Sequence, residues 1–120
     1  MEYTGTATTS RIGGIIGEVS LAGVTADNLV NTGTVTGIRA DVGGIIGYSR
    51  ISLPSSFKRL SNFGDILSTN TVVNNTENYG GIFGYIENRS APMTIEDCHN
   101  RGNLTGTSGG RAVDLSLIHI

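Results

Sequence analysis

The sequence predicts an all-β fold, a β-solenoid (parallel β-helix-like) repeat array of about three to four coils. One observation is a Gly-Gly-x-x-Gly pattern that occurs three times. The other is a second pattern, apolar-x-Asn-x-Gly-x-apolar, which follows each copy of the first by about eighteen residues. Because a unit of this size cannot bury its own apolar face, stacking of like units is expected rather than separate domains.

The first pattern occupies residues 12–17, 42–47 and 79–84, and a degraded copy begins at 109–110. Its shared residues are Gly13, Gly14, Gly17, Gly43, Gly44, Gly47, Gly80, Gly81 and Gly84. Two apolar residues, such as Ile15 and Ile16, stand inside the pattern, and a regular strand would expose one of them. Either a bulge at the glycines turns both inward, or another element covers the outer one. A phosphate cradle would require a following helix, which the sequence does not predict.

The second pattern occupies residues 29–35, 60–66 and 98–104. Its strict alternation predicts an extended strand with one inward face and one variable face in water, where Ser61 would lie. Its shared polar positions are Asn31, Gly33, Asn62, Gly64, Asn100 and Gly102. In a stack, the asparagines would form a hydrogen-bonded amide ladder. The glycines would permit a bend beside it through positive φ.

These patterns divide the chain into units. Residues 1–10 resemble the end of a preceding repeat, 11–40 form repeat 1, 41–78 repeat 2, 79–108 repeat 3, and 109–114 begin a truncated repeat. Repeat 2 is longer, and its extra residues at 49–56, which include Pro54, and at 68–78 predict surface loops. A small basic loop is predicted at Arg50, Lys58 and Arg59. Without a functional role, it would simply be a charged edge exposed to water.

The last residues, 115–120, read Leu-Ser-Leu-Ile-His-Ile and match the translation of a transposase sequencing-adapter end. We interpret them as a scar to be excluded from the fold, and the alternative is a genuine apolar final strand. His119 is therefore assigned to no site. No signal peptide follows Met1, so the true start is left open.

Composition sets limits on function. The chain of 120 residues is 38% apolar and contains 18 glycines, which suits one folded domain. Charged residues make up 15% and the net charge is −2, so no basic field favours nucleic acid or an anionic membrane. We expect no nucleic-acid partner, no membrane insertion and no cofactor.

The candidate catalytic and metal-binding residues are few. Cys98 takes the place of Leu29 and Leu60, so we interpret it as a small inward hydrophobe, and a reactive or metal-bound thiolate would have only His99 in support. The carboxylates Asp27, Asp41, Asp65, Glu96 and Asp97 are scattered. Glu96 and Asp97 are adjacent, and strand neighbours point to opposite faces. We therefore expect no catalytic and no metal site.

The combination of both patterns in register resembles the Glug-motif repeats of bacterial surface proteins, found in IgA-cleaving metallopeptidases and in large exported proteins of gut bacteria. The resemblance covers residues 11–110 and implies a noncatalytic, extracellular or cell-surface region. It carries no catalytic residue onto this chain, which lacks a His-Glu-x-x-His helix.

Two functions are compatible with these residues. The favoured one is a stalk, spacer or weak multivalent adhesive surface, whose partners are neighbouring repeats of the same longer chain and candidate host glycans or proteins. The alternative is a fragment of a β-helix enzyme that cleaves carbohydrate with clustered carboxylates. The sequons at Asn74, Asn88 and Asn103 would matter only in a eukaryotic secretory route.

Overall fold

The computed structural model describes residues 10–38, 40–69, 78–88, 91–106, 111–113 and 117–118. Throughout these ranges the chain forms short strands joined by bends, and they contain no helix. The prediction of an all-β fold is confirmed. Abundant Thr, Val and Ile in the strands, and glycines at bends such as Gly14, Gly33 and Gly64, explain this choice of structure.

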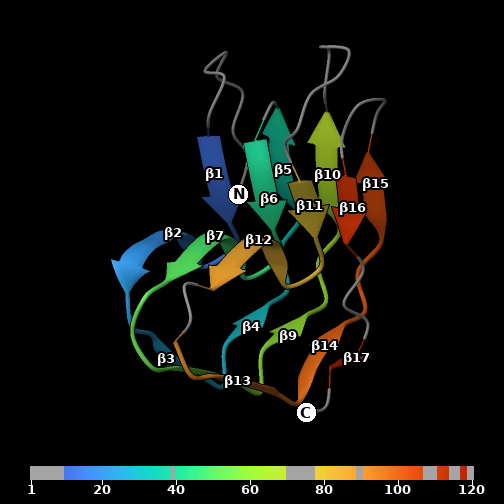
Figure 1. Cartoon of the computed structure of the whole chain (residues 1–120). Coiled ribbons are helices and arrows are strands. Elements are labelled where there is room, and N and C mark those ends of the chain that lie inside the picture. Colours follow the sequence, from blue (N-terminus) through green and yellow to red (C-terminus); the bar gives the residue numbers. More distant parts are fainter. Residues whose placement is uncertain are drawn as a thin grey trace.

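Within the described residues the strands form five sheets (Figure 1). Sheet 1 contains β1 (Ser10–Gly13), β6 (Ala40–Gly43), β11 (Asn78–Gly80) and β16 (Arg111–Val113). Sheet 2 contains β2 (Ile16–Ala22), β7 (Ile46–Ile51) and β12 (Phe83–Asn88). Sheet 3 contains β3 (Thr25–Asp27), β8 (Ser55–Lys58) and β13 (Met93–Glu96). Sheet 4 contains β4 (Val30–Asn31), β9 (Ser61–Asn62), β14 (Cys98–Asn100) and β17 (Leu117–Ile118). Sheet 5 contains β5 (Val35–Ile38), β10 (Ile66–Thr69) and β15 (Leu104–Gly106).

Each of the three units, residues 11–40, 41–78 and 79–108, contributes strands to the five sheets in the same order. Equivalent strands of successive units pair in parallel, as the β1–β6–β11 series does in Figure 1. The register matches the sequence repeat, because Ile12 pairs with Val42 and Val42 with Tyr79. The predicted parallel pairing of the Asn31, Asn62 and Asn100 strands is confirmed.

The strand β17 departs from this pattern. It pairs antiparallel with β14, so that Cys98 faces Ile118 and His99 faces Leu117. Part of the segment that we interpret as an adapter scar is thus a two-residue strand at the edge of sheet 4.

Two apolar clusters fill the space between the sheets. The larger cluster joins sheets 2, 3 and 4, and its fully buried members are Ile45, Ile46, Ile51, Phe57, Leu60, Ile82 and Cys98. The smaller cluster joins sheets 1 and 5 and contains Ile12, Val35, Val42 and Ile66. Phe57 and Phe83 meet edge to face with ring centroids 5.1 Å apart, so aromatic contacts join the second and third units.

The prediction of surface loops at 49–56 is wrong for most of that range. Ser49–Ile51 belong to β7 and Ser55–Ser56 to β8, and only residues 52–54, including Pro54, connect the two strands. The physical reason is that the first unit has equivalent residues, because Val19 pairs with Ser49 and Thr25 with Ser56. Ser68–Thr69 likewise continue β10, and Asn78 begins β11. The rest of the predicted loop, residues 70–77, lies outside the described residues.

Candidate functional site

The three asparagines of the second pattern form a ladder along sheet 4. Nδ2 of Asn31 donates to Oδ1 of Asn62 at 2.8 Å, and Nδ2 of Asn62 donates to Oδ1 of Asn100 at 2.8 Å. The residues joined in this way lie 31 and 38 positions apart in the chain. Asn62 is fully buried, so its amide is shielded from competing water. The ladder expected from the sequence is present.

Each ladder amide also holds its own chain. Nδ2 donates to the carbonyl of the glycine two residues later: Gly33 at 2.8 Å, Gly64 at 2.8 Å and Gly102 at 3.0 Å. The two hydrogens of Asn62 Nδ2 therefore have one partner in the same unit and one in the next. This double use explains why a polar side chain occupies an inward position.

The expected role of the glycines beside the ladder is wrong. Gly33, Gly64 and Gly102 do not have positive φ. A Cβ on Gly64 would lie closer than 3.0 Å to the carbonyl oxygen of Gly33, and one on Gly102 would meet Gly64 in the same way. Glycine is required at positions 64 and 102 because the backbone of the preceding unit occupies the space of a side chain.

The two sequence patterns meet in space. A Cβ on Gly44 would lie 2.5 Å from Cγ of Asn62 and closer than 3.0 Å to the carbonyl oxygen of Gly81. Gly14 faces Asn31 in the same way, and Gly81 faces Asn100. The second glycine of each of these pairs thus leaves room for the ladder amide, and Gly14 and Gly44 also leave room for the next unit.

The bend inside the Gly-Gly-x-x-Gly pattern explains its two adjacent apolar residues. The N–H groups of Ile45 and Ile46 both donate to the carbonyl of Ile82, at 3.1 and 2.9 Å. Ile15 and Ile16 share the carbonyl of Ile45 in the same way. Ile45 and Ile46 are both fully buried, so an irregularity at the glycines turns both inward, which is the first of the two alternatives.

The left-handed backbone lies elsewhere, at residues that the sequence did not single out. Asn28, Arg59 and Asp97 have φ of 57°, 52° and 51°, and each directly follows a strand of sheet 3. Asn28 N–H donates to the carbonyl of Lys58, and Arg59 N–H to that of Glu96, both at 3.0 Å. The corner repeats without glycine, and the only local signal for it is that Asn and Asp, found at positions 28 and 97, adopt positive φ more often than other non-glycine residues.

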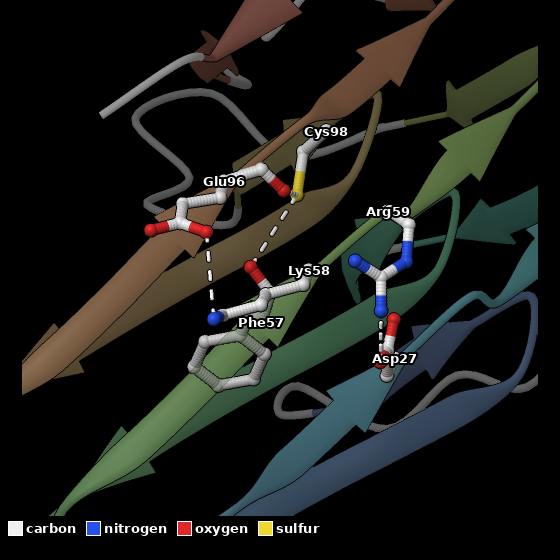
Figure 2. A network of polar contacts seen from close by, with 6 residues as sticks. All are labelled: Asp27, Phe57, Lys58, Arg59, Glu96 and Cys98. Atoms are coloured by element: carbon white, nitrogen blue, oxygen red, sulfur yellow. Dashed lines mark hydrogen bonds and ion pairs between the residues drawn. The ribbon is translucent and has the colours of Figure 1, made fainter.

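The cations expected to form a basic loop are paired with acids of neighbouring units. Arg50 Nε lies 2.7 Å from Glu87, and Lys58 Nζ lies 3.5 Å from Glu96. Arg59 pairs with Asp27, and Figure 2 shows this pair beside that of Lys58. The hydrogen bond to Glu87 raises the pKa of Arg50. The basic-loop prediction is wrong, because the stack places these cations opposite carboxylates.

The scattered carboxylates serve as structural acceptors. Asp41 accepts from the backbone N–H of Asn78 at 2.8 Å and from its side chain at 3.1 Å, while Asp65 accepts from Asn103 N–H at 3.0 Å. Burial raises the pKa of Asp41. In the described part of the chain, no three His, Cys, Asp or Glu side chains gather in a way that could hold a metal ion.

Cys98 is buried among apolar side chains and forms no disulfide. Its thiol lies 3.4 Å from the carbonyl oxygen of Glu96 and 3.8 Å from that of Phe57, the second contact being drawn in Figure 2. Burial raises the pKa of Cys98, which is the opposite of what a reactive thiolate needs. These observations support its interpretation as an inward hydrophobe.

A stacked column of side chains on sheet 2 was not predicted. The rings of Tyr48 and Tyr85 lie 5.2 Å apart with an interplanar angle of 9°. The Arg11 guanidinium lies 4.3 Å from the centre of the Tyr48 ring and also pairs with Glu18 at 3.4 Å. The signal was available, because Glu18, Tyr48 and Tyr85 each follow the last glycine of the first pattern.

Several predictions concern residues outside the described ranges. They are the repeat end at 1–9, the Gly-Gly pair at 109–110, the sequon at Asn74 and the unassigned His119.

No family model, no curated protein and no solved structure matches this chain. Among the described residues, no helix has the length and apolarity needed to cross a membrane.

Proposed function

We propose that this chain is a noncatalytic repeat module, a β-solenoid in which each unit is one coil, and that it serves as a spacer in a bacterial cell-surface or secreted protein. One observation carries the proposal: successive units contribute to the same five sheets in the same order. An architecture of this kind extends by adding units, because each unit contacts mainly its neighbours.

The interactions between units support a load-bearing role. Backbone pairing, the asparagine ladder and the ion pairs Arg50–Glu87, Lys58–Glu96 and Arg59–Asp27 all join one unit to the next. The glycines let neighbouring backbones approach closely at the ladder and at the bend. These contacts resist separation of units along the stacking direction.

The outward residues do not repeat as a recognition site would. The position after each ladder asparagine holds Thr32, Phe63 or Arg101, and the position before it holds Val30, Ser61 or His99. Such variation gives the positions beside the ladder no recurring platform for a sugar or peptide, which favours a spacer over an adhesive surface on sheet 4. The placement in a bacterial exported protein rests on the resemblance to Glug-motif repeats.

The proposal is tested by lengthening the array. Repeating residues 41–77 directly after Glu77 preserves the register, because Val42 and Tyr79 hold paired positions. Each added copy should lengthen the particle by about 4.8 Å in small-angle X-ray scattering. Added copies that leave the length unchanged or unfold the chain would refute the solenoid. Release of reducing sugar or peptide by the purified protein would refute the noncatalytic role, and tight binding to one glycan would favour adhesion.

Location requires its own experiment. Antibodies against the chain should label intact cells of its source, and protease added outside those cells should remove the label. Label that appears only after the cells are opened would contradict the surface proposal.

A further inference from the structure

One end of the ladder is less covered than its interior. Ile15 is 43% exposed, whereas Ile45 and Ile82 at the equivalent positions are 0% exposed. Asn31 is partly exposed and Gly33 exposed, whereas Asn62 and Gly64 are buried. We call the residues Gly14, Ile15, Asn31 and Gly33 the open strip.

The hydrogen bonds of Asn31 also differ from those of the interior. Oδ1 of Asn62 accepts from the amide of Asn31 at 2.8 Å, and Oδ1 of Asn100 accepts from that of Asn62. Oδ1 of Asn31 instead accepts a longer bond of 3.3 Å from the N–H of Gly33 in its own unit. In the second and third units, the equivalent Oδ1 atom accepts a hydrogen bond from the asparagine amide of the preceding unit. Oδ1 of Asn31 is therefore placed to accept an amide from another unit.

The open strip is a local feature of the first unit. Ile12 and Val35 in the same unit are 5% and 0% exposed, so sheets 1 and 5 are already covered there. The residues of the open strip lie at the bend and beside β4, which is an edge strand of sheet 4. An edge strand presents backbone donors and acceptors that another strand can pair with.

We propose that the open strip is a docking surface for a further unit with the Asn-x-Gly pattern. The asparagine of that unit would donate Nδ2 to Oδ1 of Asn31, and its glycine carbonyl would pack against Gly33. The chain shows this fit twice, where the first unit covers the second and the second covers the third. The inference rests on the proposed stacking of units but concerns a separate surface.

The space beside the Cα of Gly33 is where the fit can be judged in advance. A Cβ there would have Asn31 Oδ1 as its nearest neighbour at 3.8 Å, so the space that a preceding glycine carbonyl would fill is open. A second copy of this chain is a poorer occupant. The edge of β14 that it would present is already paired with β17.

The test inserts a copy of residues 41–77 between Ser10 and Arg11 of the full chain, so that the copy runs into β1 in register, because Arg11 and Asp41 hold paired positions. Side-chain amide exchange of Asn31 is then measured by NMR, with Asn62 of the original unit as an internal reference. Docking should slow the exchange of Asn31 on the order of tenfold, the factor that corresponds to one net hydrogen bond. The amide of Ile15 should gain protection as well.

The matched control is the same insertion with Asn62→Leu in the inserted copy only, which keeps the branching at Cγ but removes the amide donor. Asn31 should then exchange as in the unmodified chain.

Unchanged exchange with the intact insertion would overturn the docking proposal. If a copy placed after Glu77 still lengthens the particle, the proposed function survives that failure. Concentration-dependent dimers of the unmodified chain that protect Asn31 would also overturn it, because a second copy would be the occupant.

Discussion

The two halves of each unit hold their neighbours by different means. In the Asn-x-Gly half, side-chain amides join the units through 2.8 Å hydrogen bonds. In the Gly-Gly half, the carbonyl of Gly81 lies where a Cβ on Gly44 would be, so contact between backbones excludes any side chain. The first half therefore adds side-chain hydrogen bonds, which can be lost singly, to a backbone contact of the same kind at Gly64, whereas in the second half the glycine contact carries no amide bond of its own. Substitutions can separate the two effects.

The largest effect is expected from Gly44→Ala. The added methyl group overlaps both the Gly81 carbonyl and Asn62, so the units must move apart, which costs about 3 kcal/mol or more. Gly33→Ala is the control, because its nearest atom is 3.8 Å away and its φ is not positive. Urea unfolding followed by circular dichroism should show a much lower midpoint for the first variant alone. Equal midpoints for the two variants would contradict the steric explanation of Gly44.

A smaller loss is expected from Asn62→Leu. The substitution removes two ladder bonds, leaving Asn31 without its acceptor, and should lower the free energy of unfolding by about 1 to 3 kcal/mol. Ser61→Leu at the partly exposed neighbouring position is the matched control and should cost less. Chemical denaturation gives the free energy of unfolding of both variants. If their unfolding midpoints are equal, the ladder does not contribute to stability.

A gain in stability is expected from Ser49→Val. Ser49 is fully buried, and its hydroxyl has no hydrogen-bond partner among the described residues. It stands in register with Val19 and Ile86, so an apolar side chain already fits this column. The substitution should raise the free energy of unfolding by about 1 kcal/mol. A lower thermal midpoint than the parent would show that the hydroxyl has a partner.

The smallest effect concerns pH. Burial raises the pKa of Asp41 above its ordinary value of 3.8, so the folded chain binds more protons than the unfolded chain between 3.8 and the folded pKa. Stability should therefore fall as pH rises through that window. Asp41→Asn keeps an acceptor for Asn78 and should flatten this fall. Unfolding free energies of both proteins across the window provide the comparison, and parallel curves would exclude Asp41 as the source.

The sequence predicted the Asn-x-Gly half well because its information is local. A period of two assigns Asn62 and Gly64 to one face and Ser61 and Phe63 to the other, and repetition places Asn31, Asn62 and Asn100 in one column. Their hydrogen bonds follow from that placement. The fold class was predictable for the same reason.

The Gly-Gly half could not be predicted in the same way. The need for Gly44 depends on where the carbonyl of Gly81 lies, and the burial of both Ile45 and Ile46 depends on a shared acceptor in the next unit. The pairing of Arg50 with Glu87 likewise depends on register across 37 residues. In the other half, positive φ was predicted at Gly33, Gly64 and Gly102, whereas among the described non-glycine residues it occurs at Leu21, Asn28, Arg59 and Asp97.

The central claim is that equivalent residues of successive units stack in parallel register. NOE spectroscopy of the side-chain amides tests it most directly in the unmodified chain. The account predicts direct contacts from the Asn62 amide protons to those of both Asn31 and Asn100 and none between Asn31 and Asn100. Slow-exchanging, well-dispersed Asn62 amide protons that show contacts to neither asparagine would contradict it.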